Sequence, residues 1–214
     1  MDLLRFLNVR FQLVRLLLRI LQKVILLNQY DRVTNHNRQA SQAGTYWYHS
    51  HHRGQYPDGL RAPFIITDPN SPYNDVFDGR FSLSVSDWYH EEMQVLIPKF
   101  IYRGNPTGAE PVPQSVLFND TQNLTVAIEP GKTYLFNVVN IGAFAGQYIW
   151  FEGHNMTIIE VDGVYTQQAE AEMIYLGAAQ RCSFLINTKN ETNTNYAFIS
   201  SMDTVRKPGE PSFE

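Results

Sequence analysis

The sequence predicts a mainly β protein, built as a β-sandwich or a Greek-key barrel. Short segments rich in β-branched and aromatic residues are separated by Gly, Pro, Asn or Asp, and the 214 residues include 13 glycines and 11 prolines. Several short strands at such spacing are typical of sandwiches and barrels. The 43% of hydrophobic residues suffice for a substantial core.

The expected strands follow one another from residue 45 onward. Residues 129–132 (EPGK) predict a turn, since Pro fixes φ and Gly accepts a positive φ. Asp162-Gly163 is a second hairpin signal. The expected strands are residues 45–51, 64–67, 81–86, 124–128, 134–139, 156–161 and 182–187.

Residues 1–42 differ in character from the rest of the chain. They carry seven Lys/Arg against two Asp/Glu, whereas the remaining chain carries ten against nineteen. The period of residues 3–27 predicts a basic amphipathic helix, too charged for a signal peptide or a spanning helix. Three interpretations remain open. The helix lies on an anionic membrane surface, it mimics a mitochondrial presequence, or, as we favour, it is sequence unrelated to the β part, such as a mispredicted exon or an alternative start.

A possible metal-ligand motif lies in residues 44–69, GTYWYHSHHRGQYPDGLRAPFIITDP. In an extended strand side chains alternate faces, so His49 and His51 point the same way and Ser50 points the other way. Neutral imidazole is a good ligand for copper, zinc or iron. The pattern therefore indicates a metal site, although two strand histidines alone are more often surface or packing residues.

Residues 44–69 closely resemble the second copper-ligand motif of the multicopper oxidases, in which both histidines bind the type 3 copper pair. The resemblance continues through LSVSDWYHE and HNMTIIEVDGVYT, and NPTGAEP is similar to the fungal iron-transport ferroxidases. It implies cupredoxin-like domains: residues 43–72 as the end of domain 1 and 76–203 as most of domain 2. Residues 1–42 are then an atypical segment and 204–214 a divergent tail.

The resemblance implies copper as cofactor, held by ten histidines and one cysteine from four motifs. The chain has six histidines, and Cys182 has no adjacent histidine, so we expect an incomplete copper set and a buried structural Cys182. The six are His36, His49, His51, His52, His90 and His154.

Glu110 is the candidate catalytic and iron-binding residue, because the resemblance gives the glutamate of GAEP a role in binding Fe(II). Hard carboxylate oxygens suit iron, and Pro111 and Pro113 stiffen the loop. The alternative is a plain surface glutamate. The resemblance implies a further iron-site carboxylate after a stretch like SSMDT. Asp203 of this stretch is retained, but residues 205–214 (VRKPGEPSFE) depart from the family pattern just where that carboxylate should fall.

Four N-x-[ST] sequons favour a secreted or cell-surface protein. They place candidate glycosylation at Asn119, Asn123, Asn155 and Asn190. The absence of a phosphate-binding glycine loop and of a basic aromatic patch in the β part argues against nucleotide and nucleic-acid partners.

The expected function is copper-dependent oxidation of Fe(II) coupled to reduction of O2 in iron uptake, with an iron permease as a further partner implied by the resemblance. Two alternatives stay open: a non-catalytic cupredoxin-like remnant or binding module, and a laccase-type oxidase that acts on organic reductants.

Overall fold

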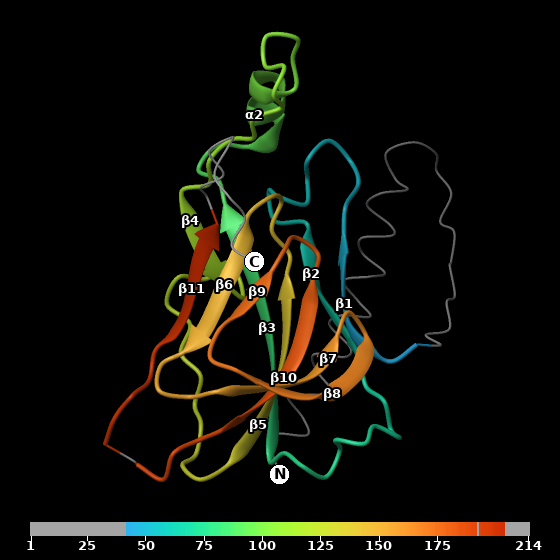
Figure 1. Ribbon diagram of the computed structural model, residues 1–214. Coiled ribbons are helices and arrows are strands. Elements are labelled where there is room, and N and C mark those ends of the chain that lie inside the picture. Colours follow the sequence, from blue (N-terminus) through green and yellow to red (C-terminus); the bar gives the residue numbers. More distant parts are fainter. Residues whose placement is uncertain (1–41, 192, 204–214) are drawn as a thin grey trace, which may run out of the picture. The chain divides into compact units, whose positions relative to one another are not determined.

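The computed structural model describes residues 42–191 and 193–203, which form a mainly β fold with one short helix (Figure 1). The elements are β1 (Gly44–His49), β2 (Arg61–Ile66), β3 (Gly79–Trp88), α2 (Met93–Phe100), β4 (Ser115–Phe118), β5 (Thr133–Asn140), β6 (Gly146–Phe151), β7 (Met156–Val161), β8 (Val164–Ala171), β9 (Ile174–Leu176), β10 (Arg181–Asn187) and β11 (Phe198–Asp203). The predicted fold class is confirmed.

Two sheets form a sandwich. The larger sheet has the order β4-β3-β5-β10-β7-β8, with β3 and β5 parallel, and the smaller one has the order β11-β6-β9. Apolar side chains from both sheets meet in one core, in which Phe136 stacks on Phe184 with ring centroids 5.9 Å apart. The largest fully buried apolar members of this core are Leu83, Val85, Val138, Ile149, Met156 and Phe184.

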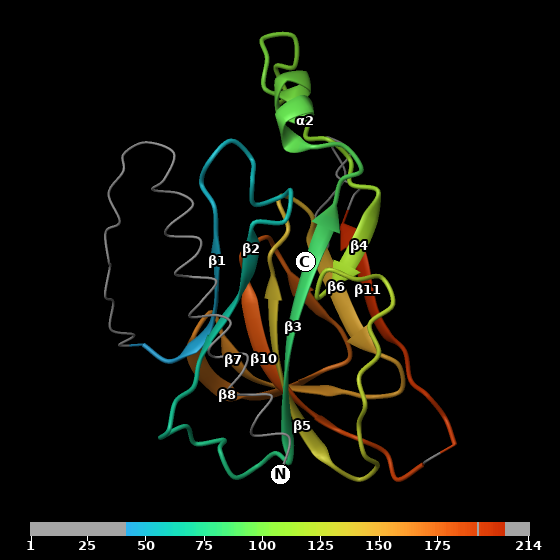
Figure 2. The same ribbon diagram turned by 180° about the vertical axis from the view of Figure 1, so that it is seen from behind.

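The central strands β5 and β10 are buried on both faces. Phe136 and Phe184 point into the sandwich core, whereas Leu135 and Leu185 belong to a second cluster on the outer face, with Tyr73 and Phe77 packed against it. The β1–β2 hairpin covers more of this outer face, beside β3, β5 and β10 (Figure 2). This double covering accounts for the nearly continuous burial along both strands.

Three of the expected strands match their observed counterparts within one residue, namely β5, β7 and β10. The strand expected at residues 124–128 is wrong, since this segment is irregular although Leu124 packs against the core. β1 ends at His49, two residues before the expected end, because a turn begins at Ser50. Helix α2 is not among the expected elements, and Pro98 inside it lowers the helix propensity of this segment.

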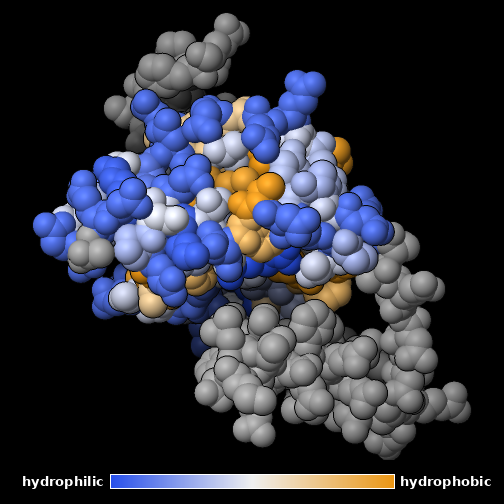
Figure 3. Space-filling model, turned by 90° about the horizontal axis from the view of Figure 1, so that it is seen from below, coloured by the Kyte–Doolittle hydropathy of each residue, from blue (hydrophilic) through white to orange (hydrophobic). Residues whose placement is uncertain are grey.

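The predicted amphipathic helix at residues 3–27 and the tail at 204–214 lie outside the described residues. Seen from below, the described surface is mostly hydrophilic around a small hydrophobic area (Figure 3). Within the part of the chain that the structure describes, no helix has the length and apolar character needed to cross a membrane.

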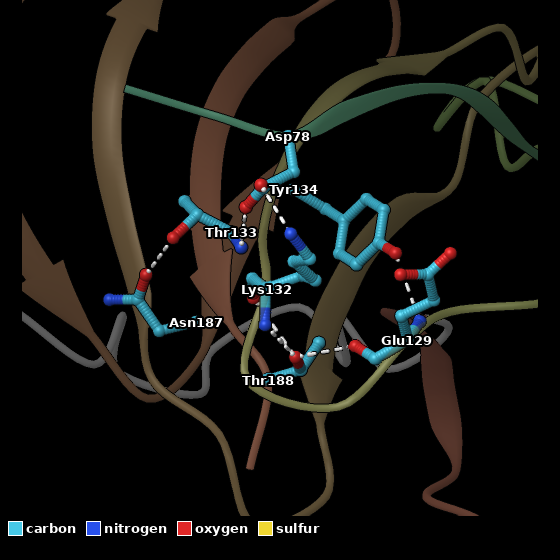
Figure 4. A network of polar contacts seen from close by, with 7 residues as sticks. All are labelled: Asp78, Glu129, Lys132, Thr133, Tyr134, Asn187 and Thr188. Carbon is cyan, nitrogen blue, oxygen red and sulfur yellow. Dashed lines mark hydrogen bonds and ion pairs between the residues drawn. The ribbon is translucent and has the colours of Figure 1, made fainter. Parts of the chain in front are cut away.

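A polar cluster ties the start of β5 to its neighbours (Figure 4). Asp78 accepts hydrogen bonds from the Thr133 amide at 2.9 Å and from Lys132 Nζ at 3.0 Å. The hydrogen bond from the Thr133 amide, and after it the contact with Lys132, lower the pKa of Asp78. The Asp78 carboxylate in turn raises the pKa of Lys132. On the other side, Thr188 accepts from the Lys132 amide and donates to the Glu129 carbonyl.

Candidate metal centre

The histidine pair lies where the β1–β2 hairpin opens into a turn. His49 is the last residue of β1 and is opposite Arg61 in the antiparallel register. The Ser50 amide donates to the Leu60 carbonyl, and the Ser50 hydroxyl donates to Gln55 Oε1. These bonds close the turn directly after His49, so His51 lies beyond the strand.

The rings of His49 and His51 stack, with centroids 4.6 Å apart and planes inclined by 27°. Trp47 stacks on His49 at 4.2 Å, and Tyr56 lies 4.8 Å from His49. His49 is half-buried and His51 is exposed. The structure therefore brings the two sequence-predicted ligands together and presents one of them to solvent.

The hydrogen bond of His49 suits a metal ligand. His49 Nδ1 lies 3.1 Å from the Ser50 carbonyl oxygen, and an Nδ1–H that donates to this oxygen leaves the Nε2 lone pair free. Two neutral imidazoles match the donor preference of copper. In residues 42–191 and 193–203 no group of three or more His, Cys, Asp or Glu side chains is arranged to hold a metal, so the pair fits copper as part of a larger ligand set.

A buried polar network holds the hairpin to the sandwich. The Thr45 amide donates to Glu160 Oε1 at 2.9 Å, and the Thr45 hydroxyl lies 3.0 Å from the Ser183 hydroxyl. Asn137 Nδ2 donates to both hydroxyls, and Arg181 Nε donates to the Thr45 carbonyl. These contacts fix the start of β1 on the outer face of β5 and β10.

Arg61 lies on the same hairpin face as His49 and is only 5% exposed. Its three guanidinium nitrogens have no hydrogen-bond partner among the described residues. Burial lowers the pKa of Arg61, while the charges of Asp120 and Asp87, followed by Tyr56 and Asp58, raise it. The charges of these acidic groups therefore favour the charged guanidinium and oppose the effect of its burial.

Asp87 organises the loop next to the hairpin turn. This fully buried carboxylate accepts hydrogen bonds from the backbone amides of Ala143, Phe144 and Ala145 and from the Tyr89 hydroxyl. Four donors compensate the burial of the charge. Burial first, and then the Asp87 charge, raise the pKa of Tyr89 far above its ordinary value.

Helix α2 projects from one end of the sandwich (Figure 1), and Glu110 lies in an exposed loop after it. Its carboxylate makes no hydrogen bond or ion pair within the described residues, and its charge contributes to the raised pKa of Tyr89. Asp203 ends β11, where Tyr175 donates to it at 3.4 Å. The structure does not join Glu110 and the histidine pair into one ligand group.

Sequence reasoning missed Asp58, Asp87 and the Thr45 network. In the sequence, Asp58 indicates only a turn, because Gly59 follows it. Asp87 is one residue of the stretch SDWYHE, which gives no sign of its partners. Except for Tyr89, which is two positions from Asp87, their partners lie 35 to 138 positions away in the chain. An acidic residue beside aromatics at a strand end was the only local signal for Asp87.

Comparisons with known proteins agree on a family. Residues 79–211 match the family model described as multicopper oxidase, and residues 26–71 match a second multicopper oxidase model. The chain is 62% identical over 168 residues to the iron transport multicopper oxidase fetC of Epichloe festucae, covering 78% of this chain and 27% of that protein. It is 47% identical over 160 residues to the iron transport multicopper oxidase FET3 of Saccharomyces cerevisiae, covering 75% and 25%.

Among solved structures, that of Fet3p, a multicopper oxidase that functions in iron import, matches with a TM-score of 0.73 and 46% identity over 76% of this chain and 30% of that chain. A point mutant of the laccase from B. aclada shares the fold, with a TM-score of 0.65 and 24% identity over 75% of this chain and 32% of that chain. The chain spans about a quarter of the length of the curated relatives it matches. Because a multicopper oxidase model matches more than half of its residues, the chain belongs to the multicopper oxidase family.

Proposed function

We propose that this chain is a segment of a copper-dependent oxidase that couples oxidation of Fe(II) to reduction of O2 in iron uptake. The observation that carries the proposal is the stacked histidine pair, whose Ser50 hydrogen bond leaves one imidazole nitrogen free for metal. Relatives that match 75–78% of this chain are named iron transport multicopper oxidases, which supports iron as the substrate.

His49 and His51 would hold copper as two donors of a set completed by further residues. Copper supplies one-electron redox chemistry: each Fe(II) loses one electron, and dioxygen takes up electrons and protons to become water. The chain's own part is to orient the ligands. The Ser50 carbonyl fixes the His49 ring, and Trp47 and Tyr56 pack against it and limit its rotation.

Glu110 would contact the Fe(II) substrate. Its carboxylate is exposed and engaged in no hydrogen bond or ion pair within the described residues, so a hard cation can approach it without displacing a protein partner. Loss of a negative charge at this place should weaken Fe(II) capture and leave neutral reductants unaffected.

A chimera tests this role: residues 42–203 replace the matching segment of Fet3p, which keeps its remaining copper ligands. We expect Glu110→Ala to lower kcat/KM for Fe(II) by roughly tenfold or more and to spare an organic reductant. Glu172→Ala, which removes another exposed carboxylate, is the matched control. Equal loss with both substrates would make Glu110 a structural residue and leave an unspecified multicopper oxidase.

For the 214-residue chain itself we expect no blue thiolate absorption and no oxygen-consuming Fe(II) oxidation above background after copper loading. Cys182 is buried, and this burial, followed by the charges of Glu160 and Asp162, raises its pKa to about 12, which disfavours a copper-bound thiolate. Blue absorption that disappears in Cys182→Ser would contradict this expectation.

A secreted or cell-surface location is part of the proposal, together with an iron permease as partner. A membrane-surface role for residues 1–27 stays one of the three alternatives given for that segment. All four sequon asparagines are exposed, which supports glycan attachment at Asn123, Asn155 and Asn190, whereas Asn119 Nδ2 donates to the Ser82 carbonyl. Enzymatic deglycosylation of the protein from its native source should shift its mass, and an unchanged mass would remove this support.

A further inference from the structure

The turn that follows the histidine pair also caps helix α2. The Met93 amide, at the first position of α2, donates to Asp58 Oδ1 at 2.9 Å. Glu92, at the N-cap position, makes no side-chain capping bond. The Asp58 carboxylate therefore supplies the capping hydrogen bond that the N-cap residue of a helix normally supplies. Its negative charge also complements the positive end of the helix dipole.

Packing joins the same two segments. Gly54 has φ +76°, and a Cβ at this position would lie 2.6 Å from Met93 Cβ, so the turn and the helix approach as closely as only glycine permits. Tyr56 packs with Met93 and Ile97 in a small apolar cluster, and its ring centroid lies 4.8 Å from that of His49, with the two planes inclined by 54°. One aromatic ring thus connects the histidine pair to α2.

A further contact connects α2 to the loop of Glu110. Asn105 Nδ2 donates to the carbonyl oxygen of Phe100, the last residue of α2, and to that of Ala109, each at 2.9 Å. Ala109 directly precedes Glu110. The backbone next to Glu110 is therefore tied to the carboxyl end of α2.

From these contacts we propose that Asp58 is a positioning residue, which holds α2 and through it the Glu110 loop in place relative to the histidine hairpin. The inference rests on the proposed function in one respect, that Glu110 contacts Fe(II). The structural part stands on the juxtaposition of Asp58, Met93 and Asn105 alone.

The capping bond matters because α2 is intrinsically weak. It has eight residues, contains Pro98 and buries only Met93 among them, and isolated helices of this length are marginal in water. The loop after it exposes Ile101, Tyr102 and Val112, so it adds little packing of its own. Loss of the Asp58 capping bond should therefore unfold α2 and the loop after it locally, while the sandwich stays folded.

The structural test compares Asp58→Ala with Asp58→Asn in the full 214-residue chain. Asparagine offers an oxygen at the same place, and mass spectrometry verifies that its amide is intact. We expect Asp58→Ala to speed amide exchange at residues 93–100 and tryptic cleavage after Arg103 by roughly three- to tenfold, and Asp58→Asn to change them by less than about twofold. Exchange in β5 and β10 should stay unchanged in both. Equal rates in Asp58→Ala and the unmodified chain would overturn the proposal.

The functional test uses the Fet3p chimera. We expect Asp58→Ala to raise KM for Fe(II) about threefold or more, with little change in kcat for an organic reductant, and Asp58→Asn to restore the original KM. Faster exchange without a change in KM would overturn the link from Asp58 to iron. If Glu110→Ala leaves Fe(II) oxidation unchanged, the iron role of Glu110 fails, while the exchange rates still decide whether Asp58 holds the loop.

Discussion

The sandwich and the histidine hairpin are both β structure, but different forces hold them in place. The sandwich encloses a core in which Val138 and Phe184 are completely buried. The hairpin is mostly half-buried, and Thr45 at its start is fixed by hydrogen bonds to Glu160 and Ser183. Hydrophobic burial is strong and non-directional, whereas hydrogen bonds are weaker and define an orientation. The comparison indicates that the sandwich supplies the stability and the polar network supplies the placement of the histidines.

The largest expected effect concerns access to the sandwich interior. Cys182 is 3% exposed, and burial raises its pKa to about 12, so we expect labelling by a thiol reagent at pH 8 to be at least roughly a thousandfold slower than in denaturant. Time-resolved mass spectrometry measures this rate. Labelling within minutes in the native chain would mean that the sheet opens locally at β10.

Truncation in the core should cost the most stability. Phe184→Ala removes a completely buried ring that packs on Phe136, and we expect a loss of about 3–5 kcal/mol in the free energy of unfolding. Chemical denaturation measures it. Val164→Ala, at a position 62% exposed, should change the free energy by less than about 0.5 kcal/mol. Similar losses in the two variants would show that the core does not dominate.

Removal of one hydroxyl should act mainly on the hairpin. Thr45→Val deletes the contacts to Ser183 and Asn137, and we expect a loss of about 1–2 kcal/mol with faster amide exchange in β1 and β2. Thr45→Ser keeps the hydroxyl and should stay near the original values. Cys182 labelling should be unchanged, so faster labelling in Thr45→Val would mean that the hairpin and the sandwich open together.

The smallest effect concerns the exposed Asp78 cluster and depends on pH. The Thr133 amide and Lys132 lower the pKa of Asp78 in the folded chain. This contribution to stability is therefore present above the ordinary pKa of aspartate, near 4, and is lost as pH falls through the lowered value. Asp78→Asn should flatten the decrease of Tm below about pH 4.

Asp75→Asn is the control for this pH dependence, because Asp75 is exposed and forms no hydrogen bond or ion pair within the described residues. Its Tm profile should follow that of the original chain. If the Tm of Asp78→Asn decreases below about pH 4 as steeply as that of the original chain, the Asp78 cluster contributes nothing to stability at neutral pH.

Much of the fold could be predicted from local pattern, where pattern and burial agree. Strands β5, β7 and β10 combine β-branched or aromatic residues with a central place in the sheet. Residues 124–128 (LTVAI) have the same propensity, yet no neighbouring strand offers them a ladder. Strand β8 (VYTQQAEA) is an exposed edge strand whose polar residues give no apolar signal.

In the candidate site, too, some features could be predicted from the sequence and others could not. The sequence could predict that His49 and His51 lie close together, but strand β1 ends at His49, and the turn that begins at Ser50 brings the His51 ring against that of His49. The roles of Asp58 and Asp87 depend on partners more than thirty residues away, which no local pattern records. The motif could therefore be recognised in the sequence, but the contacts that position it required the structure.

The most direct measurement of the hairpin's chemical role is a Cu(II) titration of the chain, followed by calorimetry and by electron paramagnetic resonance. His154, which contacts the Glu152 carbonyl and Tyr196 away from the hairpin, provides the control variant His154→Gln. We expect a bound copper with nitrogen ligands in the original chain and in His154→Gln, and its loss in the double variant His49→Gln/His51→Gln. Copper binding with the same affinity and spectrum in the double variant would contradict the assignment of His49 and His51 as copper ligands.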